Sequence, residues 1–293
     1  MSVTLTAARG PRWGEKLAYL AYQIRRSPLT MAGLTISFIV LLCMLFAPWL
    51  ASHDPNALDL GARLMPPSAE HWFGTDEVGR DLFSRVLFGS QQSVGVGLFV
   101  AFASCLIGGL LGCFSGVIGG RFDALIMRLM DIMLSVPSLV LIMALAAALG
   151  ASLFNAMLAI TLVRIPSYVR LARGQALSIR QMGYVKAAQT FGAGRWHMVH
   201  WHVARNAMPP LLVQLSLDIG SAILMASALG FIGLGAQQPT AEWGAMVATG
   251  RNYILDNWWY STFPGLAILI TATGFNLLGD GVRDLLDPRQ QGK

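Results

Sequence analysis

The sequence predicts an all-α, polytopic membrane protein with six membrane-spanning helices. Of its 293 residues, 55% are hydrophobic and only 12% are charged, whereas soluble domains carry roughly 25% charged residues. The charges gather between long apolar runs, and a helix needs about 20 apolar residues to cross the hydrocarbon layer. Together these observations exclude an ordinary soluble protein.

The first span follows Arg25 and Arg26. We interpret it as a retained helix, because a signal peptide would begin nearer the terminus and have a shorter apolar core. The uncharged stretch 132–163 is too long for one span and too short for two, so we divide it at Gly150 and extend both parts. The predicted spans, which form a transmembrane domain over 31–280, are 31–50, 93–118, 124–149, 152–172, 207–234 and 258–278.

The distribution of Lys and Arg predicts the orientation. With the N-terminus inside, 16 of these residues lie on the cytoplasmic side and 4 outside, leaving aside Arg164 within a span. Such a bias is typical of cytoplasmic loops. We therefore expect an N-terminal segment (1–30), a long loop (173–206) and a tail (281–293) in the cytoplasm, and a large loop (51–92) on the periplasmic side.

The uncharged stretch 93–120, which contains the second span, carries a glycine at every fourth position in its last part. On a helix these residues form a smooth stripe that lets another backbone approach closely. We interpret the stripe as a helix-packing surface, with the lining of a substrate path as the alternative. Its members are Gly108, Gly112, Gly116 and Gly120.

Four ionisable residues fall within or beside the spans. Arg128 and Asp131 are three residues apart and share a helix face, which predicts a structural ion pair. Asp218 has no charged residue near it in the sequence, and an intramembrane acid indicates a functional site. We expect it to face a cavity or a partner such as Arg164 or Arg205, with hydration near the membrane surface as the alternative.

The end of the outer loop also has helical periodicity. Over 80–88, apolar residues such as Leu82 and Val86 share one face, which predicts a helix lying on the membrane surface. The loop lacks the alternating oxygens and closing Glu of a calcium loop, so we expect its acidic residues to form a solvated cluster. These are Asp76, Glu77 and Asp81.

The long inner loop predicts a helix, a glycine turn and a second helix. An apolar stripe recurs at every third position, which favours a helix with one face offered to a partner. Gly192 and Gly194 then interrupt the pattern. The stripe consists of Met182, Val185, Ala188 and Phe191.

Three histidines near this turn, His197, His200 and His202, first suggest zinc. No Cys or carboxylate accompanies them, and His200 and His202 point to different helix faces. We interpret them as interfacial polar residues and predict no metal site.

Several classes of protein are disfavoured. No Lys follows a glycine-rich loop, so the chain has no P-loop. The chain also lacks a block of five Lys or Arg residues, which would have indicated nucleic-acid binding. An enzyme would need His, Cys or Glu groupings within the spans, and a secondary transporter would show an internal repeat and paired intramembrane charges; neither pattern is present. The three Cys lie in apolar runs and are interpreted as core residues.

The inner loop also resembles a known family. Ala187, Ala188 and Gly192 match the EAA-x3-G loop of permease subunits of binding-protein-dependent ABC importers. Two positions depart from that pattern: Lys186 stands where the family has Glu, and Ala204-Arg205 where Leu-Pro is usual. The first departure reverses a charge at the expected contact with the ATPase.

Other stretches resemble the dipeptide/oligopeptide/nickel branch of that family, in the same order along the chain. Within this branch, 233–239 and 257–260 look most similar to D-alanyl-D-alanine dipeptide permeases. The branch-wide matches are HWFGTDEVGRDLFSRVL at 71–87, DIML at 131–134, PSL at 137–139, GFIGLG at 230–235 and WGAM at 243–246.

The resemblance implies a type I ABC importer transmembrane domain in the bacterial inner membrane. Two permease chains, usually different ones, would enclose a path for dipeptides or short peptides, with glutathione and nickel as other cargoes of the branch. Two ATPase subunits would bind ATP and Mg on the cytoplasmic face, and a periplasmic binding protein would dock outside and do most of the substrate selection. This chain would bind no cofactor and perform no chemistry. Its helix 182–191, with Lys186, Ala187, Ala188 and Gly192, would couple ATPase closure to alternating access.

Overall fold

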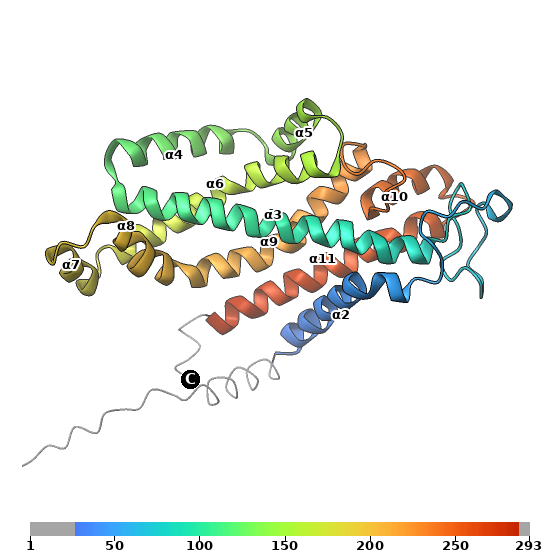
Figure 1. Cartoon of the computed structure of the whole chain (residues 1–293), viewed down its shortest axis with the longest axis horizontal. Coiled ribbons are helices and arrows are strands. Elements are labelled where there is room, and N and C mark those ends of the chain that lie inside the picture. Colours follow the sequence, from blue (N-terminus) through green and yellow to red (C-terminus); the bar gives the residue numbers. More distant parts are fainter. Residues whose placement is uncertain (1–26, 287–293) are drawn as a thin grey trace, which may run out of the picture.

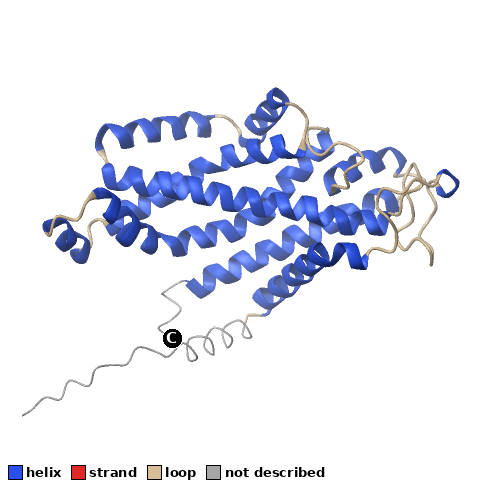
Figure 2. Ribbon diagram, in the orientation of Figure 1, coloured by secondary structure: helices blue, strands red, loops and turns tan. Residues whose placement is uncertain are grey.

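The computed structural model describes residues 27–286, so most of the predicted segment 1–30 and the last residues of the predicted tail lie outside the described part. The described residues form helices and loops without a β-strand, which confirms the all-α fold class (Figure 2). The helices make an elongated bundle, with the loop 51–81 and α10 at one end and α7 and α8 at the other (Figure 1). We call these the 51–81 end and the α7 end.

The longer helices run lengthwise along the bundle, with α2 and α11 tilted to its long axis (Figure 1). In chain order the helices are α2 (Pro28–Leu50), η1 (Leu60–Ala62), α3 (Leu82–Ile118), α4 (Gly120–Ser135), α5 (Ser138–Leu149), α6 (Leu153–Ile179), α7 (Gly183–Thr190), α8 (Arg195–His197), the π-helix η2 (Met198–Ala204), α9 (Arg205–Ile232), α10 (Trp243–Gly250), η3 (Arg251–Tyr253) and α11 (Trp259–Leu286).

Four helices are long and apolar enough to cross a membrane: α2, α3, α9 together with the preceding α8 and η2, and α11. They correspond to the first, second, fifth and sixth predicted spans. α11 continues through the first residues of the predicted tail 281–293. Side chains on the outer face of α2, including Phe38 and Trp49, are exposed, as expected of an apolar helix surface that contacts lipid.

The predicted third span, 124–149, is not one helix. It is divided into α4 and α5, which meet at an angle of 94°. Val136, between them, has extended backbone geometry, because the ring of the following Pro137 disfavours a helical conformation of the residue before it. If the bent pair counts as one span, the number of candidate spans rises to five.

The fourth predicted span, 152–172, coincides with most of the 27-residue helix α6. α6 is long enough to cross a membrane but less apolar than the four helices named above. Its sequence includes Arg164, Arg170 and Arg173, which reduce its apolar character. The predicted count of six spans is therefore not confirmed.

The predicted surface helix at 80–88 is also wrong as a separate element. α3 begins at Leu82 and continues without a break for 37 residues to Ile118. The Asp81 side chain caps its first turn by accepting a hydrogen bond from the Ser84 amide at 2.8 Å, as N-cap carboxylates commonly do. Because polar residues interrupt the apolar run around 84–92, the hydropathy pattern did not predict that the helix is continuous.

Three of the four stripe glycines lie on α3 and are packing positions. A Cβ at Gly108, Gly112 or Gly116 would meet α6 at 2.6, 2.4 or 2.6 Å, which is closer than real Cβ contacts. Gly120 is different, because it begins α4 with a φ of +61° and has open space beside it. The packing interpretation is confirmed for the α3 members, whose contacts lie within this chain.

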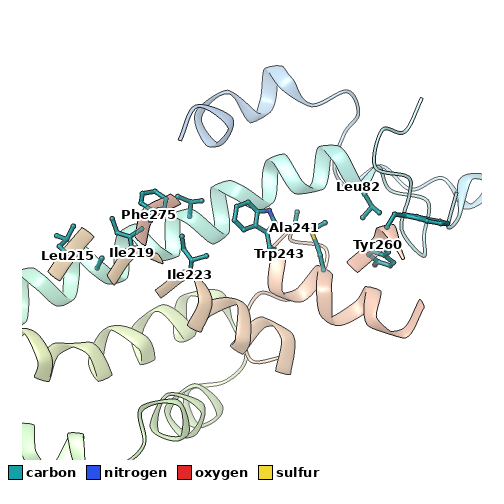
Figure 3. Packing of buried hydrophobic residues seen from close by; sticks show 12 residues of the cluster. Leu82, Leu215, Ile219, Ile223, Ala241, Trp243, Tyr260 and Phe275 are labelled. Atoms are coloured by element: carbon teal, nitrogen blue, oxygen red, sulfur yellow. The ribbon is translucent and has the colours of Figure 1, made fainter. Parts of the chain in front are cut away.

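The main apolar core joins α3, α9, α10 and α11 (Figure 3). Leu82, Ile223, Trp243 and Tyr260 are buried within it. The Trp243 indole nitrogen donates a hydrogen bond to the Val86 carbonyl at 2.9 Å, which satisfies its polar atom inside the core. This core fixes the 51–81 end relative to the long helices.

Candidate coupling helix and intramembrane ion pair

α7 is a short helix at one extremity of the bundle (Figure 1). Val185 is fully buried and packs with residues of α6 and η2, including Ile179, Met198 and Val203. Burying a Val side chain contributes about 1.5–3 kcal/mol, so Val185 anchors α7 to the rest of the chain.

The predicted apolar stripe does not present one continuous face to a partner. Val185 is buried and Ala188 packs against the same cluster, whereas Phe191 is 90% exposed. The prediction was wrong at the middle of the stripe, because residues three apart drift around a 3.6-residue helix. The exposed side of α7 instead carries Tyr184, Lys186 and Ala187.

Gly192 ends the α7 segment with a left-handed backbone conformation, at φ +83°. Its amide donates to the Gln189 carbonyl, and the Ala193 amide donates to the Ala188 carbonyl, both at 3.0 Å. Glycine is the residue best suited to this geometry at a helix C-terminus. A Cβ there would meet no atom within 4 Å, so backbone conformation, not close approach, requires the glycine.

The histidines after this turn lie on α8 and η2. The rings of His197 and His202 are 5.6 Å apart, and His200 contacts Trp201. Among the described residues, these histidines are not part of a group of ligand atoms close enough for a metal.

Asp218 on α9 and Arg164 on α6 form an ion pair inside the bundle, with Arg164 Nη1 3.5 Å from Asp218 Oδ1. The predicted pairing of Asp218 with Arg164 is confirmed. Ser221 Oγ accepts a hydrogen bond from Arg164 Nη2 at 2.8 Å, and Gln214 donates to Asp218 Oδ1 at 3.2 Å. The Asp218 side chain is buried, whereas that of Arg164 is 23% exposed.

This polar site retains unused hydrogen-bonding capacity. Asp218 Oδ2 and the Tyr168 hydroxyl are buried and have no hydrogen-bond partner in the described part of the chain. A buried polar atom without a partner costs about 1–3 kcal/mol. The pair therefore has both a spare acceptor and a partly exposed cation.

Asp131 does not pair with Arg128, so that prediction was wrong. Its carboxylate accepts a hydrogen bond from Arg170 Nη2 on α6 at 2.5 Å, while Arg128 is exposed. The three-residue spacing places Arg128 on the same helix face as Asp131, but the packing of α4 on α6 brings Arg170 closer to the carboxylate.

A bidentate ion pair at the α7 end was not predicted from the sequence. Asp123 on α4 accepts from Arg173 Nε at 2.5 Å and from Nη2 at 2.7 Å, and Ser115 on α3 donates to the same carboxylate at 2.5 Å. Such pairs combine charge with fixed geometry. In the sequence, Asp123 and Arg173 are each visible only as a charged residue beside an apolar run, and this does not show that they pair with each other.

The acidic residues of the 51–81 loop do not form the predicted solvated cluster. Asp76 is fully buried and pairs with Arg80 at 2.6 Å, and Arg85 Nε lies 3.7 Å from the same Asp76 oxygen. Asp81 is buried as well, and Glu77 accepts a hydrogen bond from the Tyr260 hydroxyl. Buried carboxylates require such partners, and several of these partners could not be identified from helical or loop spacing.

Arg85 also joins two loops that are far apart in the sequence. It lies near the start of α3 and is buried. Its guanidinium donates to the Pro55 carbonyl at 2.9 Å and the Pro239 carbonyl at 3.3 Å. The loop after α2 and the loop before α10 are therefore held together through the first turns of α3.

Comparison with known proteins identifies the family. The family model described as binding-protein-dependent transport system inner membrane component matches residues 108–292, and the N-terminal TM domain of oligopeptide transport permease C matches 18–67. The predicted resemblance to this permease branch is confirmed.

Individual relatives cover nearly the whole chain. It is 71% identical over 276 residues to the probable D,D-dipeptide transport system permease protein DdpC of Escherichia coli, covering 94% of this chain and 93% of the relative. It is 45% identical to the di/tripeptide permease DppC of Pseudomonas aeruginosa, covering 88% of each, and 42% identical to the dipeptide permease DppC of Alkalihalophilus pseudofirmus, covering 92% and 88%.

These relatives are described as permeases, in agreement with the prediction of a non-catalytic transport subunit. The chain belongs to the family of binding-protein-dependent transport system inner membrane components.

Proposed function

We propose that this chain is one of two permease subunits in an ATP-driven importer of dipeptides, with D,D-dipeptides as the first substrates to test. The 71% identity to a probable D,D-dipeptide permease over nearly the full length supports this substrate class. Both termini and α7 lie on the cytoplasmic side in this proposal, and the 51–81 end faces the periplasm. The excess of Lys and Arg in the loops at the α7 end supports that orientation.

The observation that carries the proposed coupling role is the geometry of α7. Val185 anchors one side of α7 to its own chain, while Lys186, Ala187 and Phe191 are exposed on other sides. A short helix held in this way offers a compact surface to a partner and transmits the displacement of that partner to α6 and η2. The proposed partner is one of two ATPase subunits, which supply the ATP and Mg sites.

Lys186 gives this contact a particular charge. It is exposed on α7 and stands where the family pattern has an acidic residue. The proposed ATPase contact therefore includes an ammonium group on the permease side, and an acidic or neutral ATPase surface suits it best.

We place the Arg164–Asp218 pair beside the peptide path. Intramembrane charges are costly and are typical of transport paths, and the partial exposure of Arg164 gives it access to a space outside this chain. A second permease subunit would enclose that space.

Reconstitution tests the transport proposal. The chain is assembled in proteoliposomes with its partner permease, ATPases and binding protein, and uptake of labelled D-Ala-D-Ala and L-Ala-L-Ala is measured with and without internal ATP. ATP- and binding-protein-dependent uptake is expected, with D-Ala-D-Ala preferred. Uptake that does not require ATP would contradict the proposed mechanism, and a preference for the L,L peptide would contradict the substrate assignment alone.

Reporter fusions test the orientation. Alkaline phosphatase is active only outside the cytoplasm, so a fusion after Lys293 is expected to be inactive and an insertion near Asn56 active. The opposite pattern would reverse the assignment of the two ends.

A further inference from the structure

Two histidines and one aspartate meet at the 51–81 end, far along the chain from the coupling helix and the Arg164–Asp218 pair. His53 follows α2, His71 lies in the middle of the loop, and Asp81 is the N-cap of α3. One ligand atom from each lies within 4.8 Å of the other two. We propose that these residues form a zinc site that fastens the end of α2 and the loop to the start of α3.

The first argument is the charge of Asp81. Its side chain is only 1% exposed, and the cationic groups within ion-pair distance in the described structure are His53 and His71. Arg80 and Arg85 pair with Asp76 instead. A buried carboxylate is stabilised by a positive charge beside it, and a divalent metal held together with neutral imidazoles would supply one.

The second argument is the donor set. Two imidazoles and one carboxylate are the three protein ligands of one kind of catalytic zinc site, in which water holds the fourth position, and the proposed site has this open form. Calcium and magnesium prefer oxygen ligands, whereas imidazole favours zinc and related transition metals. His53 is 37% exposed, so solvent and a metal ion have a route to the site.

The third argument is the distances between the donor atoms. His71 Nδ1 is 3.0 Å from Asp81 Oδ1, and His53 Nδ1 is 3.9 Å from Asp81 Oδ2. Ligand atoms at tetrahedral positions about 2.0–2.1 Å from zinc are roughly 3.3 Å apart. His71 Nδ1 and Asp81 Oδ1 are therefore already near ligand spacing, and the exposed His53 ring has to move toward them to complete the set.

The backbone around these ligands is held in place without a metal. The His53 amide donates to Ser84 Oγ at 3.1 Å, and the Ser84 amide donates to Asp81 Oδ2 at 2.8 Å. The His71 amide donates to Ser68 Oγ at 3.0 Å. Asp81 Oδ2 can therefore continue to cap α3 while Oδ1 binds the metal, and fixed ligand positions reduce the cost of ordering the site on binding.

Metal analysis of the full-length chain tests this proposal. Tag-free protein in detergent is treated with EDTA, incubated with Zn²⁺ and desalted, and its zinc content and affinity are measured. His53→Gln is the main variant, because an exposed loop side chain can be changed without disturbing the core. His200→Gln is the matched control, since His200 is an exposed histidine at the α7 end.

Wild type and His200→Gln are expected to bind one zinc per chain, and His53→Gln to bind it at least about tenfold more weakly, a loss typical of changes around a metal site. Co²⁺ is expected to give the intense visible absorption of a four-coordinate site in wild type and not in His53→Gln. Equal affinity in wild type and His53→Gln, retention of no zinc by wild type, or loss of binding in His200→Gln would each overturn the proposal.

Thermal unfolding in EDTA separates loss of a ligand from loss of the fold. The two variants and wild type are expected to unfold at the same temperature in EDTA, and added Zn²⁺ is expected to stabilise wild type and His200→Gln only. If Zn²⁺ stabilises His53→Gln as much as wild type, the site does not include His53 and the proposal fails.

Discussion

Gly112 on α3 lies directly against the backbone of Val169 on α6: a Cβ at Gly112 would come within 2.4 Å of the Val169 carbonyl oxygen. Backbone cannot move aside as the end of a flexible side chain can. The close packing of α3 on α6 therefore depends on the absence of a side chain at this position, as in other small-residue helix contacts in membranes.

Gly112→Leu is expected to separate the two helices and reduce the yield of folded chain, with a loss of about 1–3 kcal/mol or more, as in other overpacked cores. Size-exclusion chromatography and thermal unfolding in detergent measure the effect. Gly174→Leu on α6 is the control, because Gly174 is exposed and a Cβ there meets nothing within 4 Å. Equal losses for both variants would show that the α3–α6 contact is not the cause.

Removing one member of the Arg164–Asp218 pair should have unequal effects. Arg164→Gln leaves the buried Asp218 without its cation, whereas Asp218→Asn leaves a partly exposed Arg164 that solvent can reach. Loss of one partner of a buried pair costs about 3–5 kcal/mol, so Arg164→Gln is expected to lower the unfolding temperature more, and the double variant to recover part of the loss.

The exposed pair of Asp131 and Arg170 provides the comparison, since its side chains are 58% and 52% exposed. Arg170→Gln is expected to cost no more than about 1 kcal/mol. An Arg164→Gln variant with the stability of wild type would show that Asp218 does not depend on Arg164 as its partner. Peptide uptake by the double variant tests the path assignment separately, because that variant lacks both charges but retains a balanced site.

Gly192 can be tested through its backbone alone. Residues other than glycine are strained at its φ of +83°, but asparagine tolerates the left-handed region better than most. Gly192→Glu is expected to shift α7 and abolish peptide uptake and binding-protein-stimulated ATP hydrolysis, while the chain still inserts into the membrane. Gly192→Asn should retain most of both activities. Wild-type transport by Gly192→Glu would remove α7 from the coupling role.

Glu242 predicts a pH dependence of stability. Its buried carboxylate caps α10, with Oε1 accepting from the Gly244 amide at 2.9 Å and Oε2 from the Ala245 amide at 2.8 Å. Burial raises the pKa of Glu242 above its ordinary value of 4.5, and the hydrogen bonds from Gly244 and Ala245 oppose part of that rise. The folded state therefore retains the proton at pH values where the unfolded chain has lost it.

A raised carboxyl pKa stabilises the folded state below the unfolded pKa, and this contribution is lost as pH rises toward the folded pKa. The stability difference between wild type and Glu242→Gln should therefore fall as pH increases from about 4.5. Thermal unfolding of both proteins over this range measures it. A difference that rises with pH would mean that hydrogen bonding to the carboxylate outweighs its desolvation.

The sequence predicted those features that depend on local composition. Apolar runs located most of the long helices, the glycine spacing on α3 identified a packing stripe, and the isolation of Asp218 indicated a partner on another span. Pro137 was a local signal for the division between α4 and α5, but the apolar composition on both sides favoured a single helix.

The remaining features depend on contacts between distant segments. Asp131 pairs with Arg170, and not with Arg128, which is nearer in the sequence, because α4 packs on α6. Asp76 could be buried because Arg80 and Arg85 surround it. The grouping of His53, His71 and Asp81 depends on how the loop folds back on α3, which periodicity does not describe.

The unbroken length of α3 has a mechanical consequence. At 1.5 Å per residue, 37 residues form a rod of about 55 Å, longer than the ~30 Å of hydrocarbon it crosses. Its first turn is tied to the 51–81 loop through Asp81 and Ser84, and its last turns to α4 through Ser115 and Asp123. The 51–81 loop and α4 are therefore joined by one unbroken helix, so a displacement at either end of α3 meets no intervening loop that could absorb it.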